Sequence, residues 1–283
     1  DQLKWNIKGN GIYKNKLMVL DILANFNWER PIYFAITVGR DNFMGLENYF
    51  QLEGLAYRLV PYETKSFNGQ TGTVEVEKMY DRLVNNFNWG GFNNSNLYFD
   101  ETNTRMVMNF RNNYSRLAEA LHQDGDNTRA IRTLDKCMNE FPRETVNYSF
   151  FAIPIADVYF KAGAKEKGMH VLSEMCEDFM KEYKFYSSFN NKQTVKNLPI
   201  ITKFLFKLFH SKDTQGVKQN LSISTQILAS LFRLIQSNNL YQSDFDYIAE
   251  NDLFYKEKNN EKIKVSKSEF LINNFVDEFL SLQ

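Results

Sequence analysis

The stretch YSRLAEALHQDGDNTRAIRTLDKCMNEFP, residues Tyr114–Pro142, carries the most specific pattern in the chain. An aromatic residue, a leucine, a small residue and a large apolar residue come first. A turn glycine, a small residue, a large apolar residue and a proline follow. These residues are Tyr114, Leu117, Ala118, Leu121, Gly125, Ala130, Leu134 and Pro142. Because small side chains let antiparallel helices approach closely while larger ones fill the gaps, the pattern predicts a packed helix pair.

A weaker copy of this pattern begins 38 residues later, where Ala156 takes the place of Ala118. Its residues are Ile155, Ala156, Tyr159, Gly163, Gly168 and Leu172. This order is typical of tetratricopeptide repeats, in which helix pairs of about 34 residues recur along the chain. We therefore predict a mainly α fold, a tetratricopeptide-like helical hairpin array with units near 110–142 and 148–180. Capping helices are expected after residue 195, at Leu198–Phe209, Leu221–Leu234 and Ser268–Leu280.

The N-terminal part is mixed in character and predicts a small α/β subdomain at residues 1–72, followed by the helical repeat domain at 73–283. Apolar runs rich in β-branched and aromatic residues indicate strands, and apolar residues at helical spacing indicate helices. The predicted elements are a helix at Lys16–Phe26, a buried strand at Ile32–Val38, a short helix at Leu46–Leu52 and a second strand at Leu55–Pro61. We expect the two strands to pair with each other.

A helical rhythm at Val74–Phe87 ends in the Asn-rich stretch NNFNWGGFNNSN, residues Asn85–Asn96. Asparagine and glycine favour turns, so this stretch is predicted to be a loop pinned by Phe87, Trp89 and Phe92. An exposed loop of this kind could hold a sugar, because amides bind hydroxyl groups and tryptophan stacks on pyranose rings. A structural connection whose amides are satisfied internally is the interpretation we favour.

The charge is balanced, with 34 Lys and Arg against 34 Asp and Glu, so the chain has no overall field to attract nucleic acid. Lys256–Lys264 mixes both signs and is predicted to be exposed helix or turn. No apolar stretch reaches the roughly 18 to 20 residues of a membrane-spanning helix, and we expect the chain to be soluble. A start at Asp1, without a signal segment, suggests a fragment of a longer protein.

Motifs of the common catalytic classes are absent: the sequence has no P-loop, no dinucleotide-binding glycine motif, no nucleophile elbow and no His-Glu-x-x-His. Two cysteines and three histidines, none at ligand spacing, predict no metal site. We expect no catalytic residue and no cofactor in this chain. Cys137 and Cys176 are predicted to be buried core thiols, and a disulfide between them is left open if the domain lies outside the cytoplasm.

The best polar constellation combines Trp28, Glu29 and Arg30 with Glu47, Glu53 and Arg58. If the two predicted strands pair, Arg30 and Arg58 lie at one end of the small sheet, near these carboxylates. Such a group would form either a structural ion-pair network or a recognition site. We favour the structural network.

Several segments resemble the C-terminal soluble region of a bacterial family of large multi-spanning membrane proteins. They are LMVLDILANFNWERPIYFA (Leu17–Ala35), LEGLAYRLVP (Leu52–Pro61), NWGGFN (Asn88–Asn93), YFDETNTRM (Tyr98–Met106) and FRNNYSRLAEAL (Phe110–Leu121). The N-terminal membrane domain of that family is similar to protein O-mannosyltransferases and other glycosyltransferases that use lipid-linked sugars. The resemblance covers roughly residues 12–180.

The resemblance implies that sugar transfer belongs to membrane loops that this sequence does not contain, and that the present region faces the periplasm. Residues that match the family pattern, offered as candidate binding residues, are Trp28, Glu29, Arg30, Glu53, Tyr57, Arg58, Trp89 and Asp100. The expected function is a non-catalytic binding or scaffolding module for a protein or peptide acceptor, or for the membrane half of the parent protein. The alternative is direct glycan binding or sugar transfer through the Asn-rich loop and the Glu/Arg cluster. A third is stabilisation or dimerisation of the membrane part.

Overall fold

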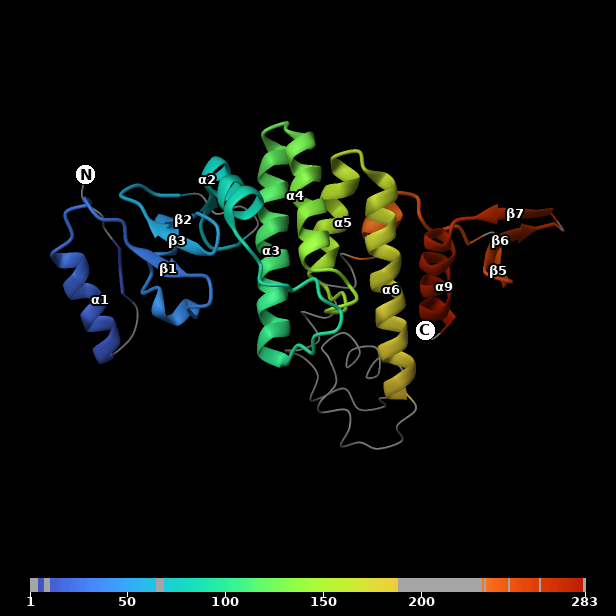
Figure 1. Ribbon diagram of the computed structural model, residues 1–283, viewed down its shortest axis with the longest axis horizontal. Helices are drawn as coiled ribbons and strands as arrows, with labels where there is room; N and C mark the ends of the chain where they lie inside the picture. The colour runs from blue at the N-terminus through green and yellow to red at the C-terminus, as the bar shows by residue number, and fades with distance from the viewer. Residues whose placement is uncertain are drawn as a thin grey trace. The chain divides into compact units, whose positions relative to one another are not determined.

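The computed structural model describes residues 5–7, 11–64, 69–187, 231, 233–243, 245–259 and 261–281 (Figure 1). They fall into two compact units, Asp1–Gly90 with Arg116–Lys136, and Gly91–Ser115 with Cys137–Gln283. The fold is mainly helical, as predicted, with helix pairs, an N-terminal four-stranded sheet and a small C-terminal sheet. The division of the chain between residues 72 and 73 stays a prediction.

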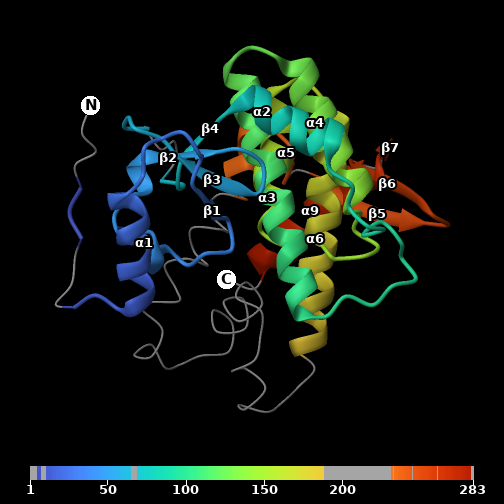
Figure 2. The same ribbon diagram turned by 60° about the vertical axis from the view of Figure 1, so that its left-hand side comes forward.

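The first unit contains a four-stranded mixed sheet in the order β1-β3-β2-β4 (Figure 2). Its strands are β1 (Tyr33–Ala35), β2 (Phe50–Leu52), β3 (Ala56–Leu59) and β4 (Thr73–Val74). The predicted pairing of the first two strands is confirmed, because β1 runs antiparallel to β3 with Tyr33 opposite Arg58. Two details were wrong. β1 is an edge strand that buries only Phe34, and the helix expected at Leu46–Leu52 is a single turn, η2 (Glu47–Tyr49), followed directly by β2; another turn, η1 (Arg40–Asn42), comes before it.

Aromatic side chains form the core beside this sheet. Phe50 is fully buried, and its ring centroid lies 4.9 Å from that of Phe34, 5.0 Å from that of Phe43 and 5.6 Å from that of Tyr57. Offset and edge-to-face contacts of this kind add to the stabilisation from burial alone. Phe50 is the first residue of β2, so its aromatic contacts hold this strand in the sheet.

The predicted N-terminal helix is present as α1 (Lys14–Ala24), but it buries no side chain against the described residues. Leu17, Met18 and Ile22 are 53%, 61% and 55% exposed. Val19, Leu20 and Leu23 of the same helix are half-buried, so the apolar side chains of α1 are only partly covered. Further along, α2 (Val76–Tyr80) and a π-helical turn, η3 (Asp81–Asn86), confirm the helical rhythm predicted for residues 74–87.

Two antiparallel helix pairs confirm the repeat pattern (Figure 1). The pairs are α3 (Glu101–Gln123) with α4 (Asn127–Glu140), and α5 (Ala152–Lys161) with α6 (Lys165–Ser187). Ala118 and Ala130 are fully buried, as close helix approach requires. A Cβ atom added to Gly168 on α6 would lie 3.1 Å from the ring of Phe160 on α5, so a larger residue there would push the helices apart.

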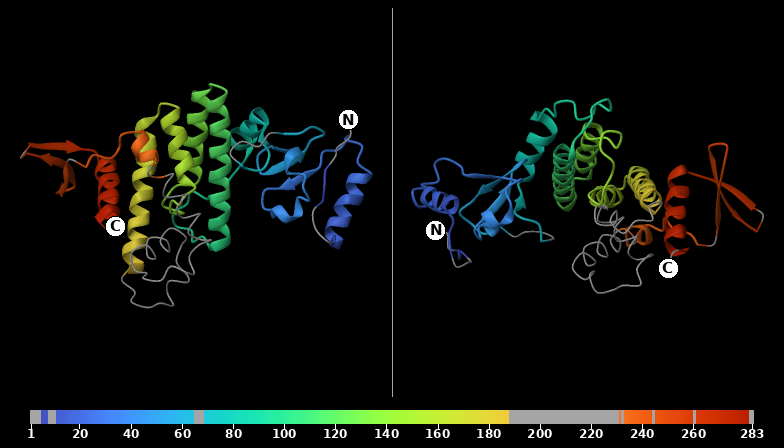
Figure 3. Two further views of the ribbon diagram at one scale, coloured as in Figure 1. Left: turned by 180° about the vertical axis from the view of Figure 1, so that it is seen from behind. Right: turned by 90° about the horizontal axis from the view of Figure 1, so that it is seen from below.

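The C-terminal part caps the second pair. Helix α9 (Lys267–Ser281) lies against α6, and Figure 3 shows it between α6 and the strands that precede it. These strands form an antiparallel sheet, β5 (Asp246–Glu250), β6 (Leu253–Lys258) and β7 (Glu261–Val265). The prediction of helix or turn for Lys256–Lys264 was therefore wrong: β6 and β7 form a hairpin, and the Phe254 ring packs 4.8 Å from that of Phe270 on α9.

Of the other predicted capping helices, Leu198–Phe209 lies outside the described residues. In Leu221–Leu234 only residues 231, 233 and 234 are described, and they are helical. None of the described helices is both long enough and apolar enough to span a bilayer.

Candidate functional site

A buried carboxylate with several partners lies at the turn between β2 and β3. We use the name Glu53 cluster for Glu53 with Tyr33, Arg58, Lys78 and Arg82. Tyr33 and Arg58 face each other across β1 and β3, and Lys78 and Arg82 are one helical turn apart on α2 and η3. The cluster thus joins two strands and the turn between β2 and β3 to one helical segment.

Gly54 makes the turn that presents the Glu53 side chain. Its φ of +96° is a conformation that L residues rarely adopt. A Cβ atom here would also lie 3.4 Å from Cδ of Arg82. That distance is an ordinary contact, so this turn requires glycine for its backbone conformation and not for space.

The carboxylate of Glu53 is fully buried, and both of its oxygens have partners. Oε1 lies 3.0 Å from Nζ of Lys78 and 3.5 Å from Nη1 of Arg58. Oε2 accepts a hydrogen bond of 2.7 Å from the Tyr33 hydroxyl and lies 3.3 Å from Nη1 of Arg82. Arg82 also donates to the Glu53 backbone carbonyl at 2.6 Å.

Two opposing effects act on the ionisation of Glu53. Burial by itself raises the pKa of a carboxyl group, because it disfavours the charged form. The hydrogen bonds from Tyr33 and Lys78, with the charges of Lys78 and Arg58, outweigh it and hold the pKa of Glu53 below its ordinary value. Glu53 is therefore ionised at neutral pH.

Replacing Glu53 with glutamine is expected to destabilise the protein by about 2 kcal/mol at neutral pH, since three cations would then face one another without a counter-charge. A carboxyl group whose pKa is lowered on folding stabilises the fold above its unfolded-state pKa, close to 4.5. This stabilisation is lost as the pH falls through the lower folded-state value. Urea unfolding should therefore separate wild type from Glu53→Gln at neutral pH, and the two should converge in acid.

The matched control is Glu29→Gln, because Glu29 is exposed and forms no ion pair with a described residue. It should change the free energy of unfolding by less than about 0.5 kcal/mol at any of these pH values. Equal effects of the two variants would show that the Glu53 cluster has no special weight in the fold.

The structure joins only part of the predicted Glu/Arg constellation. Arg58 contacts Glu53, whereas Glu29, Arg30 and Glu47 form no ion pair with a described residue. Trp28 is 42% exposed and has a φ of +65°, which is unusual for a bulky residue. Its ring centroid lies 4.6 Å from that of Phe26.

Three other candidate residues occupy structural positions. Tyr57 is buried beside Phe50, Trp89 is only 7% exposed and packs edge-on against Phe87, and Asp100 accepts a hydrogen bond of 2.8 Å from the Asn103 backbone N–H. Asp100 is thus in a capping position at the start of α3. Trp89 presents too little surface to stack on a sugar ring.

The amides of the Asn-rich loop are partly satisfied within the loop and its neighbours. The side chains of Asn85 and Asn86 donate to the carboxylate of Asp81 at 3.3 and 2.7 Å. The side-chain oxygen of Asn94 accepts from the backbone N–H of Asn96 at 3.0 Å. These contacts are those of a structural connection.

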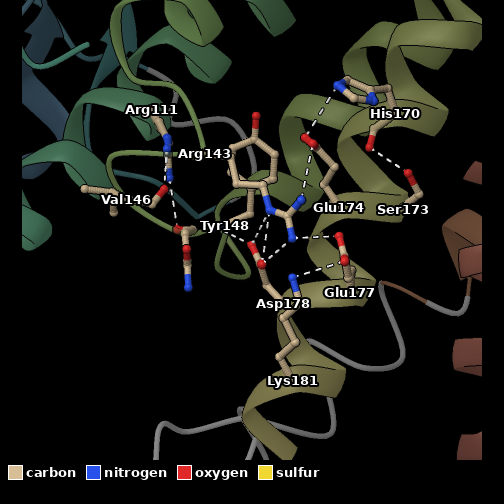
Figure 4. Close-up of polar contacts among 11 residues, drawn as sticks. Arg111, Arg143, Val146, Tyr148, His170, Ser173, Glu174, Glu177, Asp178 and Lys181 are labelled. Carbon is tan, nitrogen blue, oxygen red and sulfur yellow. Dashed lines mark hydrogen bonds and ion pairs between the residues drawn. The ribbon is translucent and has the colours of Figure 1, made fainter. Parts of the chain in front are cut away.

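An ion-pair cluster that the sequence did not predict ties the loop after α4 to α6 (Figure 4). We name it the Arg143 cluster: Arg143 lies 3.3 Å from Glu174, 2.8 Å from Glu177 and 2.6 Å from Asp178. Asp178 is nearly buried and also accepts from the Tyr148 backbone N–H at 3.1 Å. The spacing of the three acids predicts that they share one helix face. Their partner lies about thirty residues away in the sequence, and the pattern of a single helix does not identify a partner outside that helix.

A second unpredicted group is Arg111, which is 1% exposed and donates to no carboxylate among the residues that the structure describes (Figure 4). Its guanidinium donates to the backbone carbonyls of Phe141, Pro142, Val146 and Asn147 at 2.7 to 3.2 Å. Burial lowers the pKa of Arg111. Every residue has a backbone carbonyl, so a site built from carbonyl oxygens cannot be recognised from residue types.

Both cysteines are free and fully buried, so the disulfide left open above is absent. Burial raises the pKa of Cys137 to about 12 and also raises the pKa of Cys176, which makes both thiols unreactive at neutral pH. Among the residues that the structure describes, no group of three His, Cys, Asp or Glu side chains is placed to hold a metal ion.

Comparison with known proteins gives a family match for the N-terminal part of the chain. No curated protein and no solved structure matches the sequence. Residues 1–78 match the family model of TMEM260-associated domain 2, a domain that accompanies a membrane protein similar to O-mannosyltransferases.

Proposed function

We propose that this chain is a non-catalytic binding and scaffolding module of a larger, glycosyltransferase-like membrane protein, and that its helical repeat surface binds a polypeptide at the periplasmic face. The observation that carries the proposal is the pair of close-packed helical hairpins. Rigid helix pairs of this kind present an extended surface to a partner chain. The match of residues 1–78 to a TMEM260-associated domain supports the link to a membrane protein.

The exposed face of α3 supports a polypeptide as the partner. Arg105 is exposed and Asn109 and Asn112 are half-buried. All three fall on one side of this helix, opposite the buried Tyr114. Their side chains make no hydrogen bond or ion pair with a described residue. An asparagine amide can donate to a peptide carbonyl and accept from a peptide N–H, so this face suits an extended chain.

Uncovered apolar side chains in the first unit support a second contact, with the membrane half of the parent protein. Of the twelve exposed large apolar side chains among the described residues, seven lie within Ile12–Tyr33. Exposed apolar surface in such a concentration marks an interaction site.

The test uses the full chain and a library of unstructured peptides, followed by fluorescence anisotropy on the peptides that bind. The double variant Asn109→Ala, Asn112→Ala should weaken peptide binding about tenfold, since two hydrogen bonds are lost. Asn103→Ala is the matched control, because residue 103 lies on another side of α3 and should leave the affinity unchanged.

The same assay includes neutral oligosaccharides to test the alternative, sugar binding through the Asn-rich loop and the Glu/Arg cluster. Saturable sugar binding without peptide binding would replace our proposal with that alternative. Binding of neither would leave stabilisation of the membrane part as the function. Equal loss of peptide affinity in Asn103→Ala and the double variant would remove the α3 face as the binding surface.

A further inference from the structure

The Glu53 cluster carries more positive charge than its one carboxylate can neutralise. Arg58, Lys78 and Arg82 supply three positive charges and Glu53 supplies one negative charge, which leaves an excess of two. Tyr33 adds a hydrogen bond but no charge. In the described parts of the chain, none of these three cations forms an ion pair with another acid.

The other acids of the same helical segment have partners of their own. Glu75 accepts from the Lys78 backbone N–H at 2.9 Å and so caps α2. Both carboxylate oxygens of Glu77 accept from Arg129 at 2.9 Å, and Asp81 accepts from the amides of two loop asparagines. The excess charge is therefore concentrated around Glu53.

The carboxylate of the cluster is buried, and its three cations are partly exposed. The Glu53 side chain is 0% exposed, while those of Arg58, Lys78 and Arg82 are 37%, 45% and 34% exposed. A guanidinium group has five N–H donors and an ammonium group has three. The side chains of Arg58 and Lys78 each donate only to Glu53 among the described residues, so both keep donors for a ligand.

We propose that the Glu53 cluster binds an oxyanion of the phosphate class, carrying two negative charges. Two charges match the excess, and guanidinium groups pair with phosphate oxygens through parallel N–H donors. Glu53 holds the three cations together before the ligand arrives, which reduces the entropy lost on binding. The inference is independent of the proposed polypeptide site on α3, because every residue of the cluster lies in residues 33–82.

The test is an NMR titration of the full chain with inorganic phosphate at about pH 8, where phosphate carries close to two charges. Sodium chloride keeps the ionic strength constant. Backbone amide signals around Glu53 and Lys78 should shift and saturate. Lys78→Gln should weaken binding about fivefold, Lys78→Arg should keep it within about twofold, and Lys14→Gln, which removes an equal charge from exposed α1, should leave it unchanged.

Two results would overturn the site: shifts that do not saturate, or equal weakening by Lys78→Gln and Lys14→Gln, which would indicate unspecific charge attraction. If Lys78→Gln does not fold, Arg58→Gln supplies the same comparison. Co-sedimentation with phosphatidylcholine vesicles, with and without phosphatidic acid, distinguishes the source of the phosphate. Preference for phosphatidic acid that Lys78→Gln abolishes assigns a lipid headgroup, and its absence beside saturable phosphate binding assigns a free phosphate ligand.

Discussion

Replacing Arg111 with methionine is expected to lower the free energy of unfolding by about 3 to 5 kcal/mol, a large fraction of the stability of an ordinary domain. The guanidinium is 1% exposed and donates to four backbone carbonyls, at Phe141, Pro142, Val146 and Asn147. Methionine fills a similar volume but donates no hydrogen bond, so those carbonyls would lose a buried partner. A buried acceptor left without a donor costs about 1 to 3 kcal/mol.

Arg111→Lys should fall between wild type and the methionine variant, at a loss of about 2 kcal/mol. An ammonium group keeps the charge, but its three donors cannot reach the four carbonyls in the fork geometry of a guanidinium. The cation–π contact of Arg111 with Tyr148, at 4.9 Å from the ring centroid, would weaken as well.

Urea unfolding followed by far-ultraviolet circular dichroism measures these losses. Arg105→Met is the matched control, because Arg105 is an exposed residue of the same helix without an ion pair in the described part of the chain. It should change the stability by less than about 0.5 kcal/mol. A loss below about 1 kcal/mol for Arg111→Met would mean that the loop after α4 finds other donors on its own, and Arg111 would not organise it.

The helix pairs could be predicted because their close packing depends on small residues at regular spacing along the sequence. Ala118 and Ala130 are small where two helices touch, and Gly168 leaves space for the ring of Phe160. Such spacing is visible in a single sequence. The same holds for the pairing of β1 and β3, since the first run is rich in β-branched and aromatic residues and the second alternates apolar with polar residues before a proline.

The C-terminal sheet could not be predicted because its local sequence does not show which elements its strands pack against. Three charged residues end β6 and three more lie in β7, and this density of charge did not distinguish an exposed strand from an exposed helix or turn. The contact that decides the structure joins Phe254 to Phe270 of α9, an element that follows the sheet. Edge strands rich in lysine, such as β7, also resist pairing with other chains.

The candidate site could be predicted only in its centre. Glu53 and Arg58 were named together because the two strands were expected to pair, and the structure brings them within 3.5 Å. Lys78 and Arg82 could not be named, because their contribution depends on how α2 lies against the hairpin turn. Trp89 and Asp100 matched a family pattern, yet burial and helix capping explain their positions.

The same substitution, leucine to alanine, can be compared at a buried position in α3 and at an exposed position in α1. Leu121→Ala in α3 should cost about 2 to 5 kcal/mol, because the side chain is fully buried and its removal leaves a cavity between α3 and its neighbours. Leu17→Ala in α1 removes the same atoms from a side chain that is 53% exposed. It should change the free energy of unfolding by less than about 0.5 kcal/mol.

Thermal and urea unfolding of both variants, at several protein concentrations, tests whether α1 packs within its own chain, against a second copy or against another partner. Equal stability of wild type and Leu17→Ala would mean that the Leu17 side chain adds nothing to the stability of the folded chain and is left for a partner. A loss above about 1 kcal/mol that grows with protein concentration would show that a second copy of the chain covers α1. The same loss at every concentration would show that α1 packs within its own chain, and the proposed contact with a membrane half would then lose its support.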